Sequence, residues 1–147
     1  MEHGLSFSLH VLTARLDRAA DRILRAEHHV SYSRFLVLAL VGELDGSTQR
    51  VLADYLGVTE PSVSRMTGVL AGEGLLDVRP DPAGGNRRRL GLTERGAQLV
   101  AAGSRTLEDR LAMVVAESGV PYDRLLGYTT QLLETFDRLE KEREVSA

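Results

Sequence analysis

Short polar side chains and one arginine recur at helical spacing within residues 59–70, where they could hydrogen-bond to an anionic surface. If the stretch is a helix, Val63, Met66 and Leu70 lie on one apolar face, and the polar residues lie on the opposite face. A guanidinium can donate to guanine O6 and N7 or to a phosphate, and hydroxyl groups can donate to phosphates or base edges. The alternative is that Arg65 is an ordinary surface residue. We predict that the polar face contacts DNA through Thr59, Glu60, Pro61, Ser62, Ser64, Arg65 and Gly68.

A second cationic group, Arg87, Arg88 and Arg89, follows a loop rich in proline and glycine. A charge run is most often a solvated loop, but beside a DNA-reading helix its guanidinium groups would be attracted to the negative potential of a narrow minor groove. The formal net charge of the 147-residue chain is −3, so attraction to DNA must come from the placement of charges and not from their sum. We predict that these arginines and Thr48 complete the DNA-binding set.

Residues 49–70 have the features of two short helices joined by a tight turn, a helix-turn-helix. Gly57 stands where the chain must reverse, a position that favours positive φ. Thr48 and Thr59 are placed to cap the two helices, and Pro61 falls in the first turn of the second helix, where a missing N–H costs little. The apolar and small contacts expected before and across the turn are Leu52, Ala53, Leu56 and Val58.

Two alternating stretches after this motif, residues 76–78 and 90–92, predict the half-buried strands of a β-hairpin. The proline and glycine residues between them predict a long exposed tip instead of a tight turn. This hairpin is a wing, and we assign residues 31–93 to a winged helix-turn-helix DNA-binding lobe.

The helix expected at residues 33–44 is apolar nearly all round, which is typical of a central buried helix. Ser31 or Ser33 could cap its start, and residues 45–46, an Asp-Gly pair, predict the turn that ends it. We therefore expect the other elements of the lobe to pack around this helix.

Leucine stripes on both sides of the lobe exceed what a small winged helix needs. Residues 5–26 carry one stripe, which suits packing either on its own domain or on a partner subunit. Residues 94–143 follow Thr93, a predicted N-cap, and break near residues 118–121. Their last part has a seam suited to helix pairing, formed by Leu125, Thr129, Leu132, Phe136 and Leu139. We predict a mainly α chain with a small β-hairpin, in which these flanking helices form a homodimerisation region.

Several classes of protein are disfavoured by what the sequence lacks. There is no cysteine, which removes disulfides, thiolate metal sites and thiol redox sensing. We find no Gly-rich phosphate loop, nucleophile elbow or metal-ligand motif, and the His28-His29 pair lacks a spaced partner for zinc. We therefore predict no catalytic residue, no metal and no cofactor. The lack of catalytic motifs predicts that the protein is not an enzyme. No apolar run suits a membrane span and no signal peptide is evident, so we expect a cytoplasmic protein.

The order of these elements resembles the MarR family of bacterial transcription regulators over nearly the whole chain. The resemblance is carried by residues 51–53, 56–59, 61–65, Leu70, residues 73–76, Arg79, residues 81–82 and residues 92–96. It implies a homodimer that binds a near-palindromic operator, usually as a repressor, and that is often released by a small anionic or phenolic compound. The family often carries Asp-x-Arg at the wing tip. Here Gly84, Gly85 and Asn86 supply no carboxylate, which leaves open which wing arginine takes the minor-groove role.

The resemblance also implies a ligand pocket between the dimerisation helices and the DNA-binding lobe. Its candidate lining residues are His10, Arg15, His28, His29 and Tyr32. Each of them has an alternative interpretation as a plain surface or core residue. For the whole chain, the alternative is a winged-helix module that binds another protein without specific DNA binding.

Overall fold

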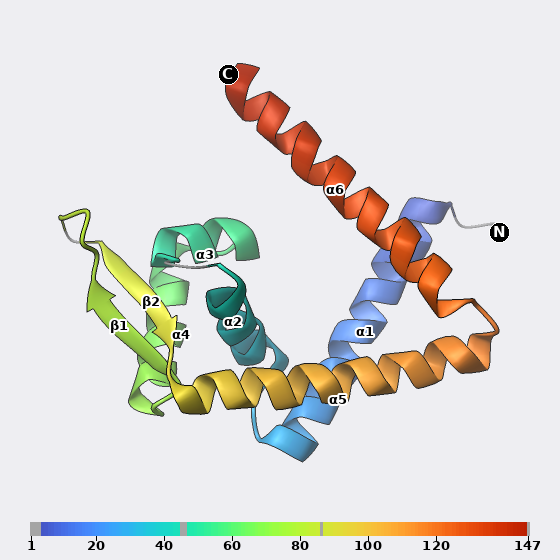
Figure 1. The fold of residues 1–147 in the computed structure, drawn as a ribbon, viewed down its shortest axis with the longest axis horizontal. Helices are drawn as coiled ribbons and strands as arrows, with labels where there is room; N and C mark the ends of the chain where they lie inside the picture. The colour runs from blue at the N-terminus through green and yellow to red at the C-terminus, as the bar shows by residue number, and fades with distance from the viewer. Residues whose placement is uncertain (1–3, 45–46, 86, 147) are drawn as a thin grey trace. The chain divides into compact units, whose positions relative to one another are not determined.

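The computed structural model describes residues 4–44, 47–85 and 87–146, and within them the chain is helical apart from one hairpin (Figure 1). Contacts divide the chain into two compact units, Met1–Leu107 and Glu108–Ala147, and helix α5 runs through the division. The elements are α1 (Leu5–His28), α2 (Tyr32–Glu43), α3 (Gln49–Leu56), α4 (Glu60–Gly72), β1 (Leu76–Pro80), β2 (Arg88–Leu92), α5 (Glu94–Ser118) and α6 (Tyr122–Ser146). This order confirms the predicted winged helix-turn-helix flanked by helices. The Asp-Gly turn expected at residues 45–46 lies outside the described residues.

Helix α2 is the centre of the first unit, as its apolar sequence predicts. It contacts α1, α3, α4 and β2, and Figure 1 shows it enclosed by them. Ser31 is its cap, because the Ser31 hydroxyl accepts a hydrogen bond from the Arg34 backbone N–H at 3.3 Å. A helix that is covered on several sides cannot keep a polar stripe, which explains why its sequence shows little amphipathic alternation. The surrounding core includes Val37, Leu38, Val41, Leu52, Ala53, Val63, Leu70, Leu75, Leu76 and Leu90.

The two strands pair antiparallel over their full length, with Leu76 opposite Leu92 and Val78 opposite Leu90 on the face that packs on the core. Asp81 N–H donates to the Arg87 carbonyl at 3.0 Å, just beyond the strand ends. Hydrogen-bonded pairs alternate with non-hydrogen-bonded pairs in such a ladder, so Pro80 falls in a non-hydrogen-bonded pair and its missing N–H breaks no bond to β2. On its other edge β2 meets the chain before α3, where Leu90 N–H donates to the Ser47 carbonyl at 2.9 Å.

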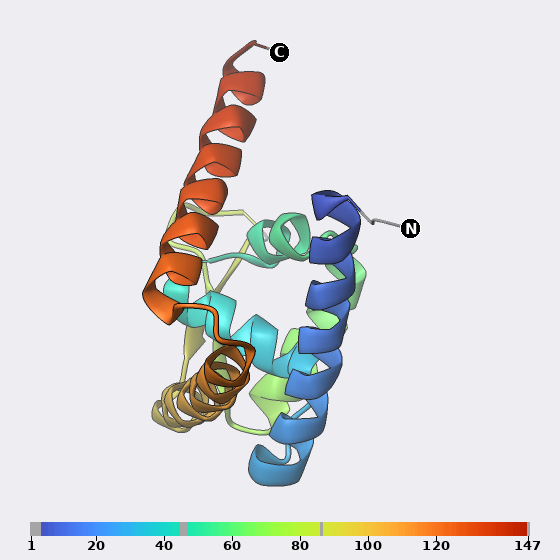
Figure 2. The same ribbon diagram turned by 90° about the vertical axis from the view of Figure 1, so that its right-hand side faces the viewer.

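Helix α1 is one unbroken helix (Figure 2) whose C-terminal end belongs to the core and whose N-terminal half does not. Leu24 is fully buried, whereas Leu5 is 73% exposed. Near the buried end, the Asp21 carboxylate accepts from Arg25 Nε at 2.8 Å and from the Tyr32 backbone N–H at 2.9 Å. The Arg25 hydrogen bond is the main cause that holds the pKa of Asp21 below its usual value. The acidic side chain thus joins α1 to the first residue of α2.

The second unit, residues 108–147, consists of the end of α5 and all of α6. Gly119 has φ +73° in the turn between the two helices, a conformation that favours glycine. The Tyr122 hydroxyl donates to Glu108 Oε1 across this turn, which raises the pKa of Tyr122. No residue of α6 is buried in the described chain.

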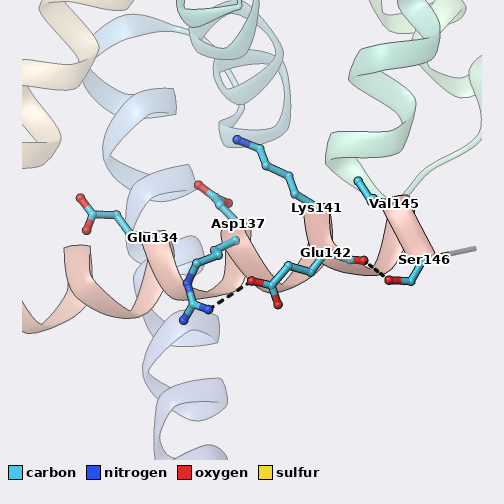
Figure 3. A pocket seen from close by; sticks show the side chains of 7 residues that line it. Glu134, Asp137, Lys141, Glu142, Val145 and Ser146 are labelled. Carbon is cyan, nitrogen blue, oxygen red and sulfur yellow. Dashed lines mark hydrogen bonds and ion pairs between the residues drawn. The ribbon is translucent and has the colours of Figure 1, made fainter.

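The surface of α6 contains a shallow hollow, shown in Figure 3. The side chains that line it all come from this one helix, and Arg138 and Glu142 form an ion pair of 3.3 Å along it. A hollow bounded by a single helix is a groove between side chains and not an enclosed ligand cavity. Among the described helices, none is both long enough and apolar enough to cross a membrane.

Candidate nucleic-acid interface

The turn between α3 and α4 has the predicted cap geometry. Thr48 Oγ1 accepts from the Val51 N–H at 3.3 Å at the start of α3, and Thr59 Oγ1 accepts from the Ser62 N–H at 3.3 Å at the start of α4. Gly57 between them has φ +63°. These caps satisfy backbone donors that a helix start leaves free, so they fix where α4, the second helix of the helix-turn-helix, begins.

The buried face of α4 contains one residue that the sequence pattern does not predict. Val63 and Leu70 are fully buried as expected, and so is Thr67. Gln49 Nε2 donates to Thr67 Oγ1 at 3.3 Å, and Thr67 Oγ1 donates to the Ser64 carbonyl at 3.2 Å. Because its hydroxyl is hydrogen-bonded on both sides, Thr67 can lie in the core without an unsatisfied polar atom. It also ties the first residue of α3 to α4.

Val58 corrects an expectation about the same turn. We expected it to supply an apolar contact across the turn, but it is 43% exposed. Its backbone takes part instead, since Val58 N–H donates to the Ala53 carbonyl at 3.1 Å. The left-handed conformation of Gly57 redirects the chain at this point, so the Val58 side chain lies outside the core.

The opposite face of α4 is polar and open. Ser62 is half-buried, while the other predicted residues of this face are exposed. Arg65 Nη2 donates to Ser62 Oγ at 3.4 Å, and Ser62 Oγ also accepts from Thr59 Oγ1 at 3.0 Å. The serine therefore links the helix cap to the one long basic side chain of the helix. Outside the backbone of α4 itself, no heavy atom of the described residues lies within 4 Å of a Cβ built on Gly68, so the backbone there is open to a close approach by another surface.

The wing separates its three arginines. Arg89 pairs with Arg79 in the ladder and lies on the outward face, Arg88 pairs with Pro80 on the other face, and Arg87 precedes the strand. All three are exposed, and none of them forms an ion pair with any residue that the structure describes. The wing is therefore a cationic surface that protein carboxylates leave largely uncovered.

Thr48 lies beside the wing as well as at the start of α3. It forms an isolated antiparallel bridge with Arg89, on the edge of β2 that faces away from β1. The structure thus brings Thr48 and Arg89 together, although about 40 residues of chain separate them. Asn86, which stands at the wing tip, lies outside the described residues.

The end of α4 is fastened to the start of α5 by contacts that sequence inspection misses. Thr93 Oγ1 donates to the Gly74 carbonyl at 2.7 Å, and Arg95 Nη1 donates to the Glu73 carbonyl at 3.3 Å. Arg34 of α2 also forms an ion pair of 3.4 Å with the Glu73 carboxylate. Both ends of α4 are thus held by hydrogen bonds.

The candidate ligand residues, by contrast, are spread along α1 and the start of α2. His10 and His28 lie on the same helix, roughly 27 Å apart at ~1.5 Å of rise per residue. Arg15 lines a hollow of about 320 Å³ bounded only by α1. His28 Nε2 is 2.8 Å from Thr106 Oγ1. Burial of the Tyr32 side chain, together with the Asp17 carboxylate, raises the pKa of Tyr32.

His29, the remaining candidate for this pocket, ends α1 in a left-handed conformation with φ 55°. It lines a separate polar hollow of about 420 Å³ at the junction of α1 and α2.

Within residues 4–44, 47–85 and 87–146, no group of three acidic or histidine side chains is placed to hold a metal ion.

Comparison with known proteins finds a likeness to one family. The family model described as "MarR family" matches residues 29–85, which span the end of α1, the helix-turn-helix and the wing up to its tip. This match covers less than half of the chain, and over it the sequence is similar to the MarR family.

Solved structures of the MarR fold extend the likeness beyond the lobe. Wild-type MarR from E. coli in its apo form matches with a TM-score of 0.79 and 18% identity, over 92% of this chain and 98% of that one. MepR from S. aureus in complex with DNA matches with a TM-score of 0.71 and 22% identity, over 93% and 99%. A mutant of E. coli MarR in complex with operator DNA matches with a TM-score of 0.71 and 19% identity, over 89% and 92%. We found no match among curated proteins.

Proposed function

We propose that this chain is a DNA-binding transcription regulator of the MarR family, a homodimer that binds a near-palindromic operator and represses transcription until a small molecule releases it. The observation that carries the DNA-binding part is local to one unit. An exposed polar face on α4 lies in the same lobe as a wing in which Arg87, Arg88 and Arg89 have no carboxylate partner among the described residues. Phosphate groups of DNA would supply the missing anions. Both MarR and MepR have been solved with DNA, which supports the same use of the fold here.

In this proposal, α4 enters the major groove and the wing follows the backbone toward the flanking minor groove. Arg65 is its main base-reading side chain, because it is the only long basic residue between Thr59 and Leu70. The hydroxyl groups at the start of α4 position the helix on phosphates. The proposed contact set is Thr48, Thr59, Glu60, Pro61, Ser62, Ser64, Arg65, Gly68, Arg87, Arg88 and Arg89.

The homodimer is supported by apolar faces that the single chain leaves uncovered. On α6, Leu132 is 50% exposed and Phe136 is 63% exposed, and on α1 the leucine stripe is exposed through its N-terminal half. Monomers rarely expose such contiguous apolar stripes. Burying one such side chain fully contributes about 1.5–3 kcal/mol, so a handful of them can hold two copies together. A two-fold pair would then place two recognition helices one DNA turn apart, about 34–36 Å.

Repression and release by a ligand are the finer part of the proposal, and they rest on the family resemblance. His10, Arg15, His28 and Tyr32 stay proposed effector contacts, but the separation along α1 means that one small compound cannot touch all four in one chain. A cytoplasmic location follows from the proposed role, because the regulator must reach the DNA. A titration with small aromatic carboxylates, read as loss of operator binding, tests this part.

The decisive experiment is selection of binding sequences from a random DNA pool by the purified protein. We expect an enriched site made of two inverted half-sites spaced by about one helical turn. Light scattering on the free protein should give twice the chain mass. Enrichment of no sequence at any salt concentration, together with capture of a defined protein partner, would replace this proposal with the winged-helix module that binds protein.

A further inference from the structure

The outward face of the wing brings together two arginines that are ten residues apart in sequence. Arg79 of β1 and Arg89 of β2 are directly opposite each other in the antiparallel ladder. Asp81 and Arg87 form a hydrogen-bonded pair, and such pairs alternate along the ladder with non-hydrogen-bonded pairs. Arg79 and Arg89, two positions further along, are therefore also a hydrogen-bonded pair, in which the Cα atoms are typically about 5.5 Å apart. Both side chains project from the same face of the hairpin.

Two like charges in this arrangement repel each other, which is destabilising unless an anion lies between them. Arg79 forms an ion pair with Asp77, whose carboxylate Oδ2 lies 3.5 Å from Arg79 Nη2. This pair is exposed, with 78% of the Arg79 side chain and 49% of the Asp77 side chain accessible. An exposed ion pair at that separation contributes little and leaves the guanidinium free to donate elsewhere. Arg89 has no ion pair with any of the described residues.

We propose that Arg79 and Arg89 together bind a single phosphate of the DNA backbone. Each guanidinium offers a planar fork of donors that suits phosphate oxygens, and a phosphate between the two would remove their mutual repulsion. Arg89 would be shared with the start of α3 through its bridge to Thr48, so the phosphate would fix the wing against the helix-turn-helix. This inference rests on the proposed DNA-binding function and adds to it a named phosphate site and one contact residue, Arg79, outside the predicted set.

The test is a double-mutant cycle read as salt dependence. Arg79→Ala, Arg89→Ala and the double variant are compared with the parent for binding to a mixed-sequence DNA duplex, because phosphate contacts do not depend on sequence. The observable is the slope of log K against log salt, which changes by about 0.9 for each phosphate contact with duplex DNA. If the two arginines share one phosphate, the double variant loses about 0.9 per protomer, or about 1.8 per dimer. Between about 50 and 200 mM salt, that difference amounts to roughly twelvefold in affinity.

The pattern across the cycle distinguishes sharing from independence. Sharing predicts that the losses of slope are not additive. In one case each single variant keeps the phosphate and only the double variant loses slope. In the other case each of the two single variants loses as much slope as the double variant. The inference is wrong if the two single losses add up to the double loss, if Arg79→Ala has no effect while Arg89→Ala equals the double variant, or if none of the three changes the slope. A parent protein that binds no duplex even at low salt would instead refute the proposed function, and this inference with it.

A matched control removes the same two charges elsewhere. Arg18 and Arg22 are exposed on α1, and the variant Arg18→Ala/Arg22→Ala should leave the slope unchanged. A second readout needs no DNA. Since the two wing arginines repel each other, removing either one should leave thermal stability unchanged or slightly raised. A lower melting temperature for both single variants would show that the pair is structural, which would also contradict the proposed site.

Discussion

Substitution of Gly96 by alanine should destabilise the protein although alanine is the better helix former. Gly96 is buried in the first turn of α5, and a Cβ added to it would overlap the Leu75 carbonyl oxygen and lie 3.1 Å from the carbonyl carbon. That carbonyl cannot move away freely, because it accepts from the Thr93 N–H at 3.2 Å. Thr93 is held in turn by its own hydroxyl, which donates to the Gly74 carbonyl at 2.7 Å.

The expected size follows from two opposing effects. Overpacking costs about 1–3 kcal/mol, and the upper part of that range applies where the obstructing atom is hydrogen-bonded backbone. Alanine in place of glycine returns up to about 1 kcal/mol of helix propensity. The net loss should be about 2 kcal/mol. Gly68 is the matched control, because it lies inside α4 and no heavy atom is within 4 Å of its added Cβ. Gly68→Ala should raise stability by up to about 1 kcal/mol.

Urea unfolding followed by far-ultraviolet circular dichroism measures both variants, at one protein concentration because a dimer's stability depends on concentration. The two substitutions are chemically identical, so opposite signs can come only from their surroundings. If Gly96→Ala is as stable as the parent or more stable, the close approach of α5 to Leu75 is not a packing constraint, and the reasoning fails.

Three further predictions concern the reading face, the dimer and acid stability. Arg65→Ala should lower operator affinity and relax base preference by about 1–3 kcal/mol at one position. Arg88→Ala should weaken binding to all sequences alike and flatten the salt dependence of binding. Parent-like binding by both variants would refute the assigned surface. Phe136→Glu places a charge on the exposed seam of α6 and should yield monomers in light scattering together with weak operator binding. The control variant Arg138→Glu, on the same helix, should stay dimeric. The pKa of Asp21 is lowered in the folded state, so its contribution to stability is present above its unfolded value and is lost as pH falls through the folded value. Asp21→Asn should therefore lose less stability than the parent between about pH 5 and pH 2 in thermal melts, and an equal loss would contradict this role.

Features that depend on neighbouring residues could be predicted from the sequence, and features that depend on tertiary approach could not. The caps at Thr48 and Thr59 and the positive φ of Gly57 are local, and all three are confirmed. Thr67 was missed because residue type alone does not show that Gln49 and the Ser64 carbonyl would satisfy its hydroxyl. Arg79 and Arg89 become partners only when the strand register is known.

The candidate ligand residues illustrate the same limit. Chemical type and the family resemblance together point to His10, Arg15, His28 and Tyr32, but neither shows where the first helix runs. Once α1 is a straight helix, residues at its two ends are separated by its length, and the partners of His28 and Tyr32 are Thr106 and Asp17. The predicted DNA-facing set is less dispersed, because its members lie within the helix-turn-helix or on one strand of the wing.

The sparse reading face implies that most of the affinity for DNA comes from electrostatic contacts of the wing. Within residues 59–70 only Arg65 is basic, whereas the wing carries four arginines and leaves three of them without an ion pair among the described residues. If Arg87, Arg88 and the shared Arg79–Arg89 site each neutralise one phosphate, a dimer neutralises roughly six, and log K should fall with log salt at a slope of about −5. A slope that steep is compatible with a chain of net charge −3, because screening at physiological salt limits each charge's reach to about 8 Å, so local contacts and not the net charge set the slope. A measured slope near about −2 would mean that the wing arginines stay in solvent when the protein is bound.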